Sequence, residues 1–263
     1  MKKYLIYIIC LIIIYFSLPL SSYALYLFES DYDKDIWYIE KLSCELVDTI
    51  PQNWYPLKFI SEYLPIDVSW DEANKEIIIF CHNLPKAICE KRYKADNLPA
   101  NLIIKNGITY CSPIILVSFL GNKSFLYNNE LYYFAGESVE SQLIKANSNN
   151  TKSFKDVILT VLYEIKLKLP DEYDFIRSHL TGKIICISRD EVPSHLSMAS
   201  AYIYYARKPP VCYIVERKVD NYILARSIAH EAFHVWQYHN DEINEEDAHA
   251  YGKEIQSRLA EIQ

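Results

Sequence analysis

The stretch that decides the fold of the C-terminal half is DNYILARSIAHEAFHVWQY, residues 220–238. Asp is a favoured N-cap residue, so a helix is predicted to begin after Asp220 and to continue to the end of this stretch. At about 100° per residue, His230 and His234 lie about 40° apart on that helix, and Glu231 lies about 60° beyond His234. The neighbouring face carries an apolar stripe of Leu224, Ile228, Ala232 and Val235. Two imidazoles can therefore meet one ion while the back of the helix is buried.

The residue types at positions 230–234 point to metal chemistry. Neutral imidazole nitrogens bind Zn²⁺ well, and a catalytic zinc site uses three protein ligands and keeps one position for water. Zinc lowers the pKa of that water toward 7. Glu231 is close enough to take the proton of the water and later to deliver it to the leaving amine. The pattern His-Glu-x-x-His therefore predicts a zinc peptidase, with His230 and His234 as ligands and Glu231 as the catalytic residue. The alternative is two ordinary histidines on an amphipathic helix.

A third ligand is expected from a second helix that begins near Glu245. Its first turn holds Glu245, Glu246 and Asp247, which could simply complement the helix dipole. Glu245 lies on the edge of the apolar stripe of this helix, whereas the other two acids point away from it. An acid on the buried side needs a partner, and zinc is one. We expect Glu245 to be the third ligand, with Glu246 next. The stripe consists of Ala248, Gly252, Ile255, Leu259 and Ile262, and its small residues allow a close approach to the first helix.

The two helices together resemble the gluzincin clan of metallopeptidases, through His-Glu-x-x-His at 230–234 and Glu-x-x-Ala at 245–248. The closest likeness is to small single-domain forms whose motif extends to a glutamine, here Gln237. The resemblance covers about residues 153–263 and implies that Glu245 is the third metal ligand. It also implies a sheet edge that accepts the peptide substrate as an added strand. An oxyanion-stabilising donor is needed as well, for which His249, Tyr204, Tyr205 and Tyr251 are candidates. His249 departs from the clan, because many relatives carry an acid there.

The rest of the C-terminal half reads as one helix and three strands. A helical stripe over residues 153–169 ends at Pro170, and strands are expected at 183–188, 201–205 and 211–216. Cys186 and Cys212 sit among apolar strand residues and are expected to be small buried hydrophobes rather than disulfide partners. The polar stretch 145–152 has no apolar periodicity, so we expect it to be a linker.

The N-terminal half shows a repeated strand and turn pattern. Residues 55–64 are expected to form a helix, and strands at 66–70 and 75–80 flank a turn. Asn106-Gly107 is a hairpin signal between two apolar strands within 102–110. A helix over 111–120 and a strand, Asn-Asn turn and strand over 125–134 follow.

This pattern resembles the stalk-like module of bacterial envelope proteins called the copper amine oxidase N-terminal-like domain. The resemblance rests on residues 55–60, 68–71 and 106–110 and covers roughly residues 50–136. It implies a structural or wall-interacting role without copper chemistry. The chain departs from the pattern of this module at two places, Cys111-Ser112-Pro113 after Tyr110 and the insert at 81–100.

The first residues have the three parts of a secretory signal peptide. Lys2 and Lys3 form a positive start, residues 4–16 are apolar, and Ser22-Tyr23-Ala24 has the pattern of a cleavage site. The chain is therefore expected to be secreted or associated with the cell envelope. An uncleaved membrane anchor is the alternative, because no charge occurs between Lys3 and Glu29. Cys10 lies in the apolar run, and the six other cysteines occur in no paired metal motif.

Composition excludes several other functions. The chain has 263 residues, a net charge of -7 and only 5 Gly, none of them close enough together to form a phosphate-binding loop. Nucleic acid is not an expected partner, because the charge is negative and no basic patch is visible. The expected fold class is α+β, with a signal peptide at 1–24, the stalk-like module at 25–144, the linker, and the metallopeptidase domain at 153–263.

Three further possibilities remain open beside the interpretation as an exported zinc metallopeptidase. One is an envelope scaffold with a degenerate peptidase domain, which the intact motif at 230–234 disfavours. Another is a zinc amide hydrolase that acts on peptidoglycan. The expected partner is a peptide or protein substrate for the peptidase, and a cell-wall component for the amide hydrolase. The third is that the N-terminal half restrains the catalytic cleft as a pro-segment.

Overall fold

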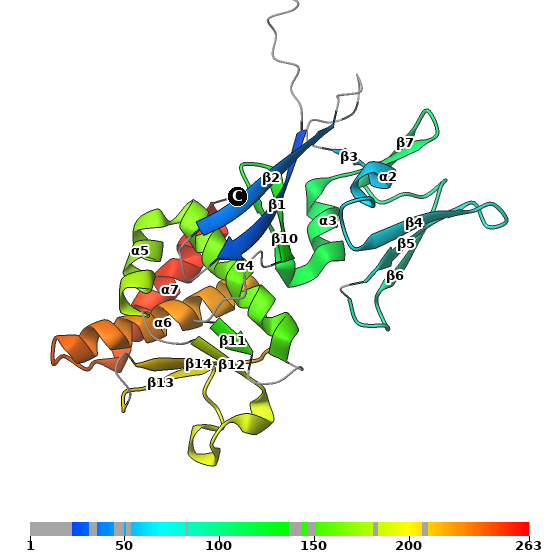
Figure 1. Ribbon diagram of the computed structural model, residues 1–263. Helices are drawn as coiled ribbons and strands as arrows, with labels where there is room; N and C mark the ends of the chain where they lie inside the picture. The colour runs from blue at the N-terminus through cyan, green and yellow to red at the C-terminus, as the bar shows by residue number, and fades with distance from the viewer. Residues whose placement is uncertain are drawn as a thin grey trace, which may run out of the picture.

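The protein is described from a computed structural model, which covers residues 23–31, 36–44, 50, 54–82, 84–136, 144–146, 151–180, 184–206 and 210–262. Helices and strands are both abundant, which confirms the expected mixed α and β class. Figure 1 shows three groups of elements: strands and short helices of the N-terminal half, a central sheet, and a helical group over a second sheet. The predicted signal peptide lies outside the described residues, apart from Tyr23 and Ala24, which begin the first strand.

The N-terminal elements agree with most of the sequence expectations. Two three-stranded sheets have the orders β3-β8-β7 and β4-β5-β6. The hairpin turn is confirmed, because Asn106 and Gly107 both have positive φ, 52° and 76°. The helix expected over 111–120 begins later, after Ser112 as its N-cap. The bounds are β3 Tyr55–Pro56, α2 Leu57–Ile60, β4 Ile66–Asp71, β5 Glu76–Cys81, β6 Glu90–Lys94, β7 Leu102–Lys105, β8 Ile108–Cys111 and α3 Pro113–Leu120.

A central sheet with the order β2-β1-β10-β9 joins the two halves of the chain. Alternate residues of its strands face different cores, as the period of two requires. Leu25 and Leu131 belong to the N-terminal core. Phe28 and Phe134 belong to the C-terminal core, where the Phe28 ring lies 4.4 Å from the Tyr163 ring. The strands are β1 Tyr23–Asp31, β2 Ile36–Cys44, β9 Ser124–Tyr127 and β10 Glu130–Gly136.

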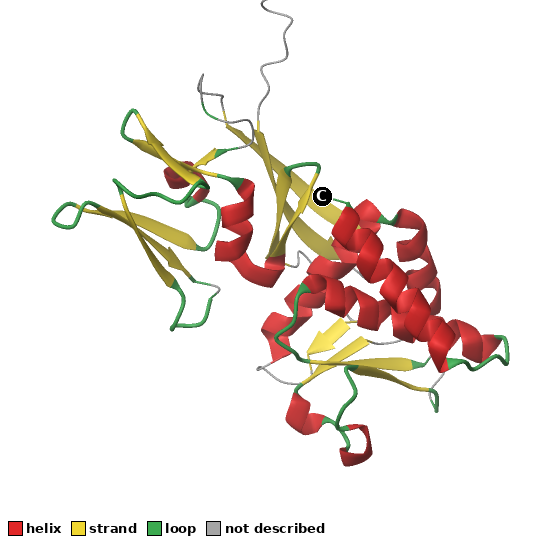
Figure 2. Ribbon diagram, turned by 180° about the vertical axis from the view of Figure 1, so that it is seen from behind, coloured by secondary structure: helices red, strands yellow, loops and turns green. Residues whose placement is uncertain are grey.

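The C-terminal half packs four helices over one side of a sheet with the order β11-β12-β14-β13 (Figures 1 and 2). β11, β12 and β14 run parallel, whereas β13 is antiparallel to β14 and forms one edge. The expected strands and the expected helix before Pro170 are confirmed. The bounds are β11 Ile144–Ala146, α4 Lys152–Lys168, α5 Pro170–His179, β12 Ile184–Ile187, β13 Ala201–Tyr204, β14 Val211–Val215, α6 Asn221–His239 and α7 Glu245–Glu261, with short 3-10 turns η2 Gly121–Lys123, η4 Arg189–Glu191 and η5 Ser194–Leu196.

The stretch 145–152 differs at both ends from the linker that its polar composition predicts. Its first two residues belong to β11, which pairs in parallel with β12, and α4 begins at Lys152. Thr151 between them is fully buried. Main-chain pairing does not depend on apolar side chains, so polar composition concealed this strand. Residues 147–150 lie outside the described part of the chain.

Two strands of the C-terminal sheet, β12 and β14, each carry a buried cysteine. Cys186 and Cys212 are buried, and neither forms a disulfide with another described residue, which agrees with their expected role as small hydrophobes. Among the helices that the structure describes, none has both the length and the apolar character needed to span a membrane.

Candidate metal centre

The helix that carries the His-Glu-x-x-His motif forms as the sequence predicts. α6 begins after Asp220, whose side chain accepts a hydrogen bond from the Ile223 N–H at 2.9 Å. Its predicted apolar stripe is buried: Leu224, Ile228, Ala232 and Val235 are at most 2% exposed. The buried stripe holds the helix in one rotation, so the opposite side presents the histidines.

The second helix crosses close to the first through a glycine. Asn244 caps α7, with its side chain accepting from the Glu246 N–H at 2.9 Å. Ala248 and Gly252 are buried on the face toward α6. A Cβ at position 252 would lie 2.7 Å from the Arg226 carbonyl oxygen and 3.3 Å from the His230 Cβ. The first separation is shorter than any normal contact, so the glycine is what allows α7 to approach the histidines.

Gly252→Ala is therefore expected to destabilise the chain although Ala is the better helix former. The gain in helix propensity is about 1 kcal/mol, whereas overpacking typically costs about 1–3 kcal/mol. Thermal unfolding and zinc titration of the variant would measure both consequences, a lower Tm and weaker zinc binding. An unchanged Tm with unchanged zinc affinity would contradict the close approach of the helices.

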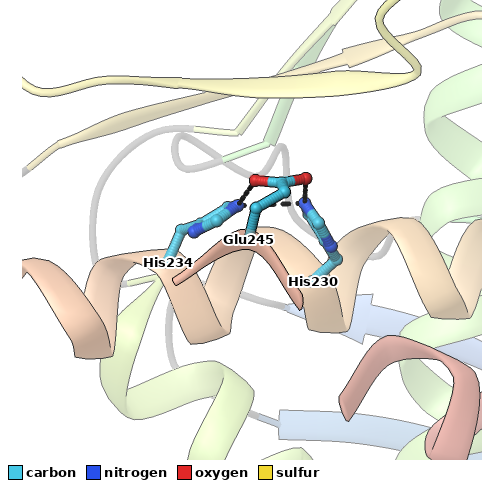
Figure 3. Close-up of side chains that lie close together, drawn as sticks. All are labelled: His230, His234 and Glu245. Atoms are coloured by element: carbon cyan, nitrogen blue, oxygen red, sulfur yellow. Dashed lines mark hydrogen bonds and ion pairs between the residues drawn. The ribbon is translucent and has the colours of Figure 1, made fainter. Parts of the chain in front are cut away.

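Three side chains from these two helices converge on one point (Figure 3). The Nε2 atoms of His230 and His234 lie 3.0 Å apart. Glu245 places Oε1 3.3 Å from the His230 Nε2 and Oε2 2.9 Å from the His234 Nε2. In a tetrahedral site with bonds of about 2.0–2.1 Å, ligand atoms lie roughly 3.3 Å from one another. The two nitrogens and the carboxylate thus have the chemistry and nearly the spacing that zinc requires.

Gln237 fixes the orientation of one histidine and the start of α7. This buried side chain donates from Nε2 to the Asn244 carbonyl at 2.7 Å, so its Oε1 faces His234. The His234 Nδ1 lies 2.9 Å from that oxygen and must carry the proton as the donor. In the tautomer with its proton on Nδ1, the lone pair of Nε2 points toward His230 and Glu245. Such an outer partner selects the tautomer that a metal ligand needs.

Gln237→Leu is expected to weaken zinc binding by about 10- to 100-fold, because it removes the acceptor of His234 and the contact with Asn244. Gln237→Glu keeps an acceptor for His234 and loses only the donor to Asn244, so its loss should be smaller. Competition with a zinc chelator would measure the affinities. Equal zinc affinity in the wild type and in Gln237→Leu would show that this glutamine does not position the ligands.

The burial of the three side chains differs from one expectation. The side chains of His230 and His234 are 18% and 15% exposed, but that of Glu245 is 74% exposed. The reasoning that Glu245 needs a partner because it is buried was therefore wrong, although the structure does bring it to the histidines. Glu246 is exposed, and its side chain does not join the cluster. Without a metal, an ion pair between the exposed Glu245 and the histidines would contribute only about 0–1 kcal/mol to folding stability.

Electrostatics at the site suit both metal binding and proton transfer. Burial, followed by the charge of His234, lowers the pKa of His230, which favours the neutral imidazole that binds metals. Burial, followed by the charge of Glu245, raises the pKa of Glu231 to about 8. A carboxyl group with a pKa near neutrality can both accept and return a proton.

A cleft of about 430 Å³ opens beside these residues. It lies between α6, α7 and the start of β13, the edge strand of the sheet, and Ala201 of that strand is part of its wall. Of the described residues, none before Ala199 lines this cleft. The lining consists of Ala199, Ser200, Ala201, Arg217, Ile223, Arg226, Ser227, His230, Glu231, Glu245 and His249.

The structure places the four oxyanion candidates differently. His249 lines the cleft, one helical turn from Glu245. Tyr251 does not line it: its ring lies 5.1 Å from the ring of Phe175 and 5.1 Å from that of Phe233. Tyr251 follows Glu245 by six residues and so points about 240° away from it around the helix, whereas His249 lies only about 40° away. This is why His249 lines the cleft and Tyr251 does not.

The two remaining candidates come from the end of β13 and the residue after it. Tyr204 is half exposed, and Tyr205 stacks on Tyr238 with ring centres 4.5 Å apart. Burial, followed by the charge of Glu231, raises the pKa of Tyr205 to about 12. Neither tyrosine lines the cleft.

Sequence reasoning missed two arginines of the cleft, Arg226 and Arg217. A signal existed for the first, because Arg226 precedes His230 by four residues and so shares its face of the helix, about 40° away. Arg217 follows β14 in an irregular segment, where no periodicity indicates direction.

The chain was compared with models of protein families, with curated proteins and with solved structures, and none of the three comparisons found a match.

Proposed function

We propose that this chain is a zinc-dependent hydrolase that cleaves peptide bonds. The observation that carries the proposal is the convergence of His230, His234 and Glu245 within 4.8 Å beside Glu231 in one cleft. The three donors would hold the metal, and their chemistry fits zinc, for which two imidazoles and a carboxylate are a known catalytic set. Bound zinc supplies a Lewis acid and lowers the pKa of water toward neutrality.

The side chains of the chain itself have separate roles in this proposal. Glu231 takes a proton from the attacking water and returns it to the leaving nitrogen, for which its raised pKa is suited. Gln237 keeps His234 in the tautomer that binds metal. β13 is an edge strand next to the cleft, and no described strand pairs with its outer side, so an extended peptide could add there as a further strand.

The finer architecture and the location belong to the same proposal. The C-terminal half would be a zincin-like domain, with α6 as the active-site helix and α7 as the helix that bears Glu245. The N-terminal half would be a stalk-like module, and the chain would be exported to the cell envelope or beyond. A pro-segment role for the N-terminal half finds no support, because the described part of that half does not line the cleft.

The proposal is tested by hydrolysis of a casein and of a mixed peptide library by the full chain, before and after zinc removal with a chelator. We expect hydrolysis that is lost on chelation and restored by zinc. Cleavage of peptidoglycan cross-links but not of peptides would favour the amide hydrolase. Zinc binding without hydrolysis of either substrate, or no zinc binding, would favour a scaffold protein.

A further inference from the structure

Two arginines form one end of the cleft. Arg226 is one turn before His230 on α6, and Arg217 lies in the segment that leads from β14 into α6. Both side chains are partly buried, and both line the cleft together with the metal-binding residues. A partly desolvated guanidinium interacts more strongly with an anion than an exposed one does.

Neither guanidinium is neutralised by a carboxylate. The Arg226 Nη2 lies 2.9 Å from the Nε2 and 3.2 Å from the Nδ1 of His249, and Arg217 donates to the hydroxyl of Ser200. Neither partner carries a negative charge, because an imidazole and a hydroxyl are not anionic near neutral pH. Within the described residues, no Asp or Glu forms an ion pair with either arginine, and Glu245 is directed to the histidines. Buried charges normally have partners, so these two fit a partner that arrives with the substrate.

The cleft therefore has two chemically different ends. The antiparallel crossing of α6 and α7 puts Glu245 beside His234 and puts His249 beside Arg226. Four residues of helix separate Arg226 from His230 by about 6 Å along the axis. An extended peptide covers roughly 3.3–3.6 Å per residue, so this separation corresponds to one or two residues.

Resting on the proposed hydrolase function, we propose that Arg226 and Arg217 bind a carboxylate of the substrate one or two residues from the bond that is cleaved. Guanidinium groups match carboxylates through paired hydrogen bonds, and two of them beside one scissile position would select strongly for such a group. The carboxylate can be the free C-terminus of a short peptide or an acidic side chain within a longer one.

The test uses three N-acylated tripeptides. They are Ala-Ala-Ala with a free C-terminal carboxylate, Ala-Ala-Ala with a C-terminal amide, and Ala-Ala-Glu with a C-terminal amide. The wild type is expected to cleave the carboxylate-bearing peptides with kcat/KM about 10- to 100-fold higher than the neutral amide. Arg226→Gln and Arg217→Gln should each reduce this ratio, and the double variant should bring it near one. Arg92→Gln, which removes the same charge from β6, should keep the ratio of the wild type.

A binding experiment separates this proposal from the proposed reaction. Calorimetry of the zinc-loaded Glu231→Gln chain should show that the two carboxylate-bearing peptides bind more tightly than the neutral amide. Adding Arg226→Gln and Arg217→Gln to this chain should abolish the difference in affinity. Discrimination in binding without turnover would support carboxylate recognition and contradict only the hydrolase. Turnover without discrimination, or discrimination that survives both arginine variants, would overturn carboxylate recognition and leave the hydrolase supported. Preference for the free acid alone would assign the C-terminus, and equal preference would assign any nearby carboxylate.

Discussion

Glu231→Gln is expected to lower the kcat of peptide hydrolysis by about 10²- to 10⁴-fold and to leave zinc binding unchanged. The amide has nearly the same shape as the carboxyl group but cannot accept a proton. Glu231 lines the cleft and is not one of the three converging ligands, so the metal cluster is kept. Steady-state kinetics together with elemental analysis would measure both quantities.

The matched control for this variant is Glu254→Gln, which removes an exposed carboxylate from α7 and should keep the rate of the wild type. A loss of less than about tenfold in Glu231→Gln would remove its role in proton transfer. Loss of zinc from this variant would instead mean that Glu231 contributes to metal binding.

Glu245→Ala is expected to have the second large effect, the loss of zinc with little change in folding stability. Removing one of three ligands should weaken zinc binding by more than the roughly 10- to 100-fold that loss of an outer partner costs. The free energy of unfolding of the zinc-free chain should change by only about 0–1 kcal/mol, because the Glu245 side chain is 74% exposed. Zinc competition and denaturation with chelator present would measure the two effects.

Glu246→Ala is the matched control for Glu245→Ala, because Glu246 is the next acid in the same turn of α7. Both acids lie in the first turn of α7, so either substitution removes the same favourable interaction with the helix dipole. Only Glu245 contacts the histidines, and only its variant should lose zinc. Equal zinc affinity in the two variants would contradict the assignment of the third ligand.

Helix periodicity predicted most of the candidate site. The stripes of α6 and α7 are strictly helical in spacing, and they define which side chains are buried and which face the partner helix. His230 and His234 could therefore be proposed together, whereas Glu245 was proposed from its place at the edge of the α7 stripe although its side chain is 74% exposed. Contacts across the two helices, such as Arg226 with His249, depend on how far α7 slides along α6, and no spacing within one helix encodes this offset.

Some elements escaped prediction for separate physical reasons. β6 reads Glu-Lys-Arg-Tyr-Lys at 90–94 and has no apolar face, because it pairs at a sheet edge with little burial. α5 was missed because Pro170 was interpreted only as the end of α4, whereas it is also the first residue of the next helix. Residues 25–28 of β1 contact a core on each face of the sheet, so this segment lacks the alternation that identifies a strand.

The packing of residues from the two halves of the chain into one core was the least predictable feature. The sequence suggests a polar boundary near residue 150, but Phe28, Phe134 and Tyr163 share one core across it. The contact of Phe28 with Tyr163 joins residues more than a hundred positions apart, and local patterns carry no signal for it. Deletion of the N-terminal half would expose this core, so experiments on the site should use the full chain.

The most direct test of the central claim is the zinc content of the purified full chain after dialysis, measured beside the double variant His230→Ala, His234→Ala. The account predicts about one zinc per chain in the wild type and almost none in the double variant. A wild-type chain that retains no zinc after incubation with it, or a double variant that retains as much as the wild type, would contradict the assignment of these residues as a metal centre.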